Sequence, residues 1–128
     1  MLFRSLLMIL LLIDLVQFFH TRLRLGTCAL NYYLYKIGCK ESPVCFCGFY
    51  SETIKHFLLE CPLYSAPRIN LLSSAARIFA DRWFSMSKAQ IVSVFLFGSQ
   101  LLSSKQNNDL FSHVQSFISE SKRFYKST

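Results

Sequence analysis

Three cysteines and one histidine lie close together in a pattern that suits metal binding. Cys45, Cys47, His56 and Cys61 follow the spacing C-x-C-x8-H-x4-C. Zn²⁺ prefers four nitrogen or sulfur ligands in a tetrahedron, and three thiolates with one imidazole are a common structural set. The pattern therefore predicts a structural zinc site. Fewer residues than usual separate the first two cysteines. An alternative therefore stays open, in which Cys45 and Cys61 are small buried apolar side chains and His56 lies in the core or at the surface.

The cysteine count also favours metal chemistry over disulfides. The chain has five cysteines, an odd number, and three of them lie between residues 45 and 61. Such clustering indicates a metal site in a reducing compartment more than a disulfide framework. Cys39 could compete for a ligand position, and Cys28 is expected to be a packed thiol.

Short-range signals predict how the ligands are presented. Gly48 follows the cysteine pair and can adopt the positive φ that a chain reversal needs. Ser51 is a typical N-cap, and Glu52 suits the positive end of a helix dipole. We therefore expect a loop over residues 39–50 and a histidine-bearing helix over residues 52–60.

The end of that helix decides whether the last ligand reaches the metal. Cys61 comes five residues after His56, which is roughly 140° away from the same face of an α-helix. Pro62 disfavours the α conformation at the residue before it. We therefore expect the helix to break near residue 60, so that Cys61 can turn back towards His56.

The rest of the chain predicts a small, mostly α domain. No stretch has the alternating pattern and turn signals of paired strands. The expected segments are an apolar N-terminal helix (1–20), a zinc-binding region (21–68) and C-terminal helices (69–128). Within them, helices are expected over residues 2–25, 29–37, 67–79, 88–97 and 109–125, with Gly26, Gly38 and Gly98 as stops, and with Ser87 and either Asn107 or Asn108 as N-caps.

Two of these helices have a predicted buried face. The apolar stripe of helix 67–79 consists of Ile69, Leu72, Ala76 and Phe79. The broader face of the last helix consists of Leu110, Val114, Phe117, Ile118 and Phe124. Basic side chains suit the negative end of a helix dipole, and the last turn is expected to hold Lys122, Arg123 and Lys126.

The first residues form an apolar run that has three interpretations. Residues 6–13 follow Arg4 as in a signal peptide, but the bulky residues after Asp14 offer no cleavage site of small residues. Residues 5–19 are fewer than the about 20 apolar residues needed to span a bilayer core, and they include Asp14. We expect a packing helix; a membrane or signal segment and a misassigned first residue are the alternatives.

The charge balance favours anionic partners. Lys and Arg number 14 against 7 Asp and Glu, which gives a net charge of +7. Such an excess attracts nucleic acid or a membrane surface. The basic residues are scattered without a run of five, so an equally good explanation is that they keep an apolar chain in solution.

The ligands and their flanking residues together resemble a known family. The matching segments are residues 21–26, 30–34, 42–48 and 52–64, followed by Arg68. They resemble the zinc-binding region near the C-terminus of non-LTR retrotransposon reverse transcriptases. The resemblance implies that Cys45, Cys47, His56 and Cys61 are the zinc ligands, and it implies contact with template RNA or target DNA.

The sequence departs from this family in its catalytic residues. Phosphoryl chemistry with two metal ions needs clustered carboxylates, whereas Asp14, Asp81 and Asp109 are isolated. Four protein ligands would leave no open position on zinc for water. We therefore expect a non-catalytic fragment of a retroelement, either a tail that begins at a chance Met or a captured remnant.

The expected partner is RNA or DNA, without a small-molecule substrate. The predicted phosphate contacts are Arg22, Arg24, Lys36, Lys40, Lys55 and Arg68, and the tyrosines that could stack on bases are Tyr32, Tyr33 and Tyr50. Packing in the core and at its rim is the alternative for all of them. Other functions left open are a zinc-stapled structural or protein-interaction module, or a small membrane-associated protein. The expected location is intracellular, nuclear or cytoplasmic, unless residues 1–19 anchor the chain to a membrane.

Overall fold

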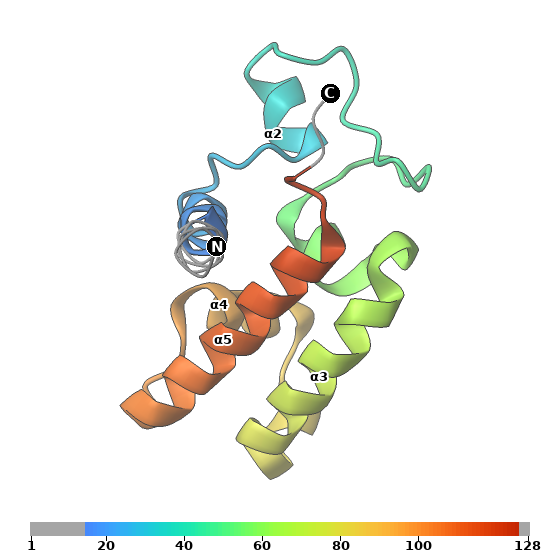
Figure 1. The fold of residues 1–128 in the computed structure, drawn as a ribbon. Helices are drawn as coiled ribbons and strands as arrows, with labels where there is room; N and C mark the ends of the chain where they lie inside the picture. Colours follow the sequence, from blue (N-terminus) through green and yellow to red (C-terminus); the bar gives the residue numbers. More distant parts are fainter. Residues whose placement is uncertain (1–14, 126–128) are drawn as a thin grey trace, which may run out of the picture.

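Helices form all the regular structure in the computed structural model, which describes residues 15–125 (Figure 1). No strand occurs in that range, which confirms the mostly α prediction. A helix over residues 15–25 comes first, and the elements after it are α2 (Asn31–Lys36), a π-helix η1 (His56–Glu60), a 3-10 turn η2 (Pro62–Tyr64), α3 (Ser65–Phe79), a 3-10 helix η3 (Ala80–Ser85), α4 (Lys88–Phe97) and α5 (Ser104–Ser121).

The packing of α5 against α3 forms the centre of the core. Figure 1 shows α5 running obliquely beside α3, with α4 behind it. The predicted buried face of the last helix is confirmed for Leu110, Val114, Phe117 and Ile118, and Phe124 packs partly buried against them. Full burial of one such side chain stabilises the fold by about 1.5–3 kcal/mol. The core is one cluster of buried residues from the expected segments 21–68 and 69–128, and Phe19 of the first segment packs partly buried against it.

The buried face of α3 differs from the predicted stripe by one position. Ile69 is 64% exposed, whereas Leu71 and Ala75 are buried. Of the predicted stripe, Phe79 alone is buried. The helix is rotated because Arg68 turns inwards to backbone carbonyls, and residues three and four positions along the helix share its face.

Helix boundaries follow their caps. Ser87 and Gly98 bound α4 as predicted, and the Ser87 hydroxyl accepts the amide of Gln90. The predicted start of the last helix is wrong, because Ser103 and Gln106 form a capping box that begins α5 five residues earlier than 109. Asn107 is not a cap. Its side chain instead accepts the amide of Ser99 at 2.9 Å.

His20 fixes the first helix to the core. Its Nε2 lies 2.9 Å from the carbonyl oxygen of Phe95 in α4, and its Nδ1 lies 3.1 Å from the side-chain nitrogen Nε2 of Gln115 in α5. Burial lowers the pKa of His20 to about 4. A neutral ring that donates from Nε2 and accepts at Nδ1 satisfies both contacts.

The first helix ends at Gly26 as predicted, where φ is +74°. The apolar run over residues 1–14 lies outside the described residues, and so does Lys126. Within residues 15–125, no helix has the length and apolar character needed to cross a membrane.

Candidate metal centre

The first two cysteines lie on a tight turn. The amide of Gly48 donates to the carbonyl of Cys45, and the amide of Cys45 donates to the carbonyl of Phe49, both at 2.9 Å. Gly48 has a φ of +97°, as its position predicted. The amide of Phe49 lies 3.4 Å from Cys47 Sγ, so the turn directs a backbone donor at this sulfur.

His56 and Cys61 are brought together by the π-helix. The amide of Cys61 donates to the carbonyl of His56 at 2.7 Å. A π-helix bonds residues five positions apart, which is the separation of these two ligands. Pro62 then ends the helix, and Cys61 is extended at ψ 122°. The predicted break near residue 60 is confirmed. The prediction did not include the π-helical turn, which brings residues five positions apart together.

The start predicted for this helix is wrong. The helical residues begin at 54, and Thr53 Oγ1 accepts the amide of His56 at 3.1 Å. Ser51 is therefore not the N-cap. Glu52 lies before the helix and is completely buried, so it does not occupy an exposed first turn.

Arg68 holds the carbonyls of the π turn. Its guanidinium donates to the carbonyls of Phe57, Leu58 and Cys61 at 2.7–2.9 Å. A wide turn leaves such carbonyls without helical partners, and one planar side chain satisfies all three. Arg68 is buried and fully engaged, so it is a structural residue of the site and is not available to a phosphate.

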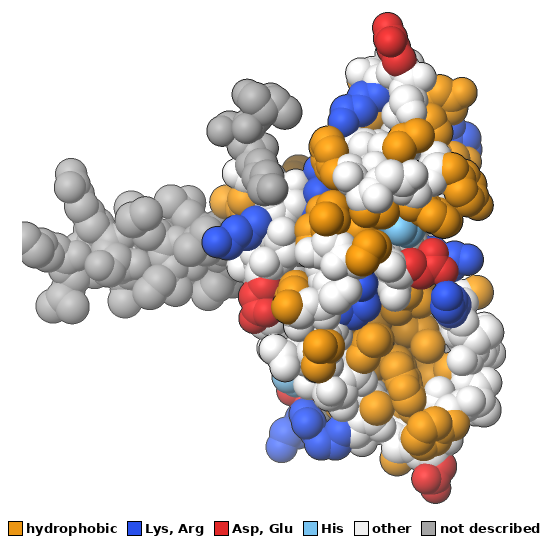
Figure 2. All heavy atoms as spheres, turned by 90° about the vertical axis from the view of Figure 1, so that its right-hand side faces the viewer, with side chains coloured by type: hydrophobic (Ala, Val, Ile, Leu, Met, Phe, Trp, Pro, Cys, Tyr) orange, Lys and Arg blue, Asp and Glu red, His pale blue; other side chains and the backbone are white. Residues whose placement is uncertain are grey.

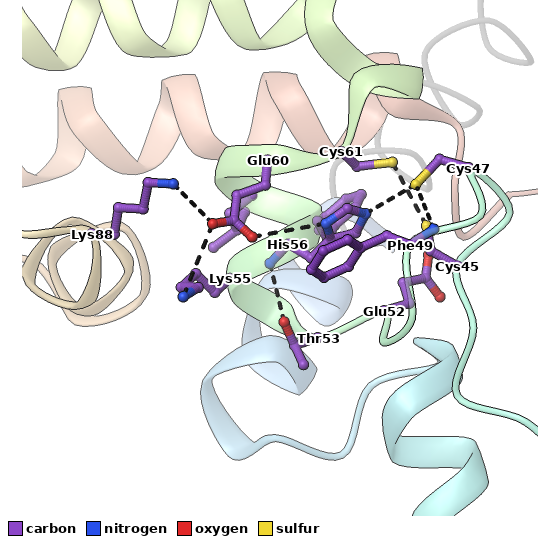
Figure 3. Close-up of polar contacts among 12 residues, drawn as sticks. Cys45, Cys47, Phe49, Glu52, Thr53, Lys55, His56, Glu60, Cys61 and Lys88 are labelled. Atoms are coloured by element: carbon purple, nitrogen blue, oxygen red, sulfur yellow. Dashed lines mark hydrogen bonds and ion pairs between the residues drawn. The ribbon is translucent and has the colours of Figure 1, made fainter.

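The four expected ligands converge from these two elements (Figure 3). Their ligand atoms all lie within 4.8 Å of one another. Cys45 Sγ lies 3.7 Å from Cys61 Sγ, and Cys47 Sγ lies 3.3 Å from His56 Nε2. Zn–S bonds of about 2.3 Å and Zn–N bonds of about 2.0–2.1 Å give tetrahedral edges of about 3.8 Å and about 3.6 Å. The arrangement is thus a possible metal site, and the donor set and these two separations suit a tetrahedral ion.

The pKa shifts of the four possible ligands are those expected of groups that would bind a cation. Burial raises the pKa of Cys45 to about 12 and also raises the pKa of Cys61. The amide of Phe49 is the main cause of a lowered pKa at Cys47. Buried thiolates are unfavourable unless a positive charge lies beside them, and a bound metal ion supplies one. Burial lowers the pKa of His56, which favours the neutral imidazole that binds metals.

Two carboxylates lie just outside the ligands. Glu60 Oε1 is 3.8 Å from His56 Nδ1, a buried atom without a hydrogen bond, and Glu60 Oε2 is 2.9 Å from Lys88 Nζ (Figure 3). On the other side, Glu52 Oε2 lies 3.9 Å from Cys45 Sγ. A carboxylate that accepts a hydrogen bond from a metal-ligating histidine orients its ring, and Glu60 lies beside the His56 nitrogen that could donate such a bond.

Arg123, near the C-terminal end of the described residues, forms an ion pair with Glu52. Its Nη2 and Nε donate to the two carboxylate oxygens of Glu52 at 2.7 and 2.8 Å. Nη2 also lies 3.2 Å from the side-chain oxygen of Asn31. The placement of Arg123 in the last helical turn is therefore wrong. α5 ends at Ser121, and Lys122 has a φ of +55°, which turns the chain towards Glu52.

The other predicted site residues are spread around this centre. Cys39 is exposed and Cys28 is buried, and both lie outside the four-residue cluster. Arg24 is partly buried, donates to the carbonyl of Leu96 and lies over the ring of Phe111. The exposed basic side chains are those of Arg22, Lys36, Lys40 and Lys55, and among the tyrosines Tyr32 and Tyr50 are exposed while Tyr33 is partly buried.

Comparison with known proteins relates a short stretch of the chain to a retroelement. The chain is 49% identical over 39 residues to a retrovirus-related Pol polyprotein from the type-1 retrotransposable element R1 of Bradysia coprophila. That stretch is 30% of this chain and 4% of the relative. No family model and no solved structure matches the chain. The expected similarity to retrotransposon polyproteins is therefore confirmed over this short stretch.

Proposed function

We propose that the chain is a non-catalytic zinc-binding module derived from a retrotransposon reverse transcriptase, and that it contacts nucleic acid. The observation that carries the proposal is the convergence of three sulfurs and one imidazole nitrogen within 4.8 Å of one another. Cys45, Cys47, His56 and Cys61 would hold the ion. Zinc with four protein ligands supplies a structural cross-link and no open position for a reacting water.

The support for nucleic acid is electrostatic. The chain carries a net charge of +7, and Arg22, Lys36, Lys40 and Lys55 are exposed. Exposed lysines and arginines bind phosphates by releasing condensed counterions. We do not include Arg24 and Arg68, because backbone carbonyls already occupy their guanidinium groups.

Two measurements test the proposal separately. Elemental analysis of the purified chain is expected to give equimolar zinc. Filter binding of an oligonucleotide is expected to weaken steeply as salt rises, since each phosphate contact adds to the slope of affinity against salt. Equimolar zinc without retention of the oligonucleotide at low salt would remove the nucleic-acid part and leave the metal part.

One observation favours a second function, a zinc-stapled structural or protein-interaction module. Phe57 and Leu58 lie between the ligands His56 and Cys61, and both are completely buried in the core. Metal binding and core packing are thus joined in one turn. This function predicts that chelators unfold the chain and that the folded chain has no affinity for nucleic acid.

A further inference from the structure

An exposed aromatic ring lies directly between two of the metal ligands. Phe46 is 66% exposed although Cys45 is buried and Cys47 is partly buried. Its backbone is fixed, because the amides of Cys45 and Gly48 are both bonded within the turn. A large apolar side chain held open to solvent on a rigid turn is suited to contact a partner.

Two cations lie over this ring. Lys40 Nζ and the guanidinium carbon of Arg123 each lie 5.1 Å from the centre of the Phe46 ring. Neither cation is free to move away, since Lys40 donates to the Asn31 side chain at 2.7 Å and Arg123 is bonded to Glu52. Both cations bond the side-chain oxygen of Asn31, so they lie on one side of Phe46, and the exposed ring offers its other face to a partner.

The same end of the molecule repeats this pairing of ring and cation. Lys36 Nζ lies 5.8 Å from the centre of the Tyr32 ring, and Tyr50 is 74% exposed. Figure 2 shows hydrophobic and basic side chains together at the upper end of the molecule, which in Figure 1 carries α2 and the loop after it. Within residues 31–50 the one acidic residue is Glu41.

Rings and cations in this arrangement match the chemistry of an unpaired nucleic acid strand. Its bases offer flat faces to aromatic rings, and its phosphates are anionic. In a duplex the faces of the bases are covered by neighbouring base pairs, so an aromatic side chain cannot stack on them. An apolar protein partner would not need lysines at the border of the rings.

We propose that exposed side chains of residues 31–50, chiefly Phe46 and Lys40, with Tyr32, Lys36 and Tyr50 in the same segment, bind single-stranded nucleic acid, with a base stacked on Phe46 and phosphates beside the lysines. This inference rests on the proposed function and specifies its ligand. It makes Phe46 the main stacking residue and assigns the lysines to phosphates.

The test compares variants of the full zinc-loaded chain in fluorescence anisotropy with labelled oligouridylate and with a duplex of equal length. Phe46→Ala is expected to weaken oligouridylate binding about tenfold or more, because stacking on one aromatic ring contributes that much. Phe46→Trp is expected to retain binding. Lys36→Ala is expected to reduce the salt slope by about one phosphate contact.

Phe84→Ala is the matched control. Phe84 is 87% exposed and lies in η3, after the far end of α3, which is about 22 Å long. Its removal is expected to leave binding unchanged. Thermal unfolding and zinc content of every variant verify that the turn is intact.

The outcomes separate this inference from the proposed function. Salt-dependent binding that does not distinguish single strand from duplex, or that tolerates Phe46→Ala as well as Phe84→Ala, overturns the inference and leaves the proposed function standing. Binding to neither probe overturns the inference together with the nucleic-acid part of the proposed function, and leaves the metal part standing.

Discussion

The knuckle (residues 39–61) and the helical core formed by helix 15–25, α3, α4 and α5 are stabilised by different interactions. In the core, apolar side chains such as Phe95, Phe117 and Ile118 are fully buried, and burial supplies the free energy. In the knuckle, Phe57 and Leu58 are the large apolar side chains that are completely buried, whereas Phe46 and Tyr50 are exposed. The shape of the knuckle depends on turns, on Glu52 and on the four converging ligands. From this difference we expect the knuckle to depend on a bound metal ion more than the core does, although the two regions meet at Phe57 and Leu58.

Loss of one ligand should have the largest effect. Cys61→Ser is expected to abolish zinc binding and to unfold the knuckle, because zinc contributes on the order of 10 kcal/mol to small structural sites. Zinc content, and thermal unfolding with and without chelator, measure the effect. Cys39→Ser is the matched control, since Cys39 is exposed and outside the cluster, and it should keep equimolar zinc. Full zinc occupancy in Cys61→Ser would refute the ligand set.

Truncation in the core should reduce stability without changing the metal. Phe117→Ala is expected to lower the free energy of unfolding by about 3–5 kcal/mol, because it removes a buried ring and leaves a cavity. Urea unfolding at saturating zinc measures this loss, and zinc content of the folded fraction should stay equimolar. If zinc were released over the same urea range in which the core unfolds, the two regions would unfold as one unit.

Local signals in the sequence were sufficient for part of the fold. Ser87 and Gly98 bound α4 because each acts through neighbouring residues. The sequence also held a signal for the start of α5 that we did not use, the capping-box pattern from Ser103 to Gln106. The cysteines and the histidine were correctly predicted to converge, since their spacing already contains the turn and the break that position them.

Contacts between distant residues were beyond sequence reasoning. Glu52 and Arg123 are 71 residues apart, and no local pattern predicts their pairing. The same cause displaced the predicted stripe of α3, because Arg68 turns inwards to carbonyls of another element. Polar side chains that enter the interior to satisfy backbone groups rotate helices, and periodicity of apolar residues alone cannot indicate this.

The Glu52–Arg123 pair joins the two regions and should have the next largest effect. Arg123→Gln is expected to destabilise the chain by about 3–4 kcal/mol, since it leaves a buried carboxylate without its cation. The unpaired charge beside Cys45 should also weaken zinc binding, which a competing chelator measures. Arg77→Gln, an exposed change on α3, is the control. If Arg123→Gln destabilised the chain but left zinc affinity unchanged, the Glu52–Arg123 pair would stabilise the helical core alone.

Acid should weaken the helical core through His20, independently of the metal. The unfolded chain binds the His20 proton with a pKa near 6.5, and the folded chain binds it only near pH 4. Stability from the neutral ring is therefore complete above about pH 6.5 and falls as pH drops towards 4, by about 3 kcal/mol in total. Acid would also release a metal ion held by the four ligands, so wild type alone cannot separate the two effects. His20→Gln shares the zinc site and lacks the titrating ring. The difference in unfolding free energy between wild type and His20→Gln should thus shrink as pH falls from 6.5 to 4, whereas a constant difference would show that His20 does not titrate in this window and that acid acts through the knuckle.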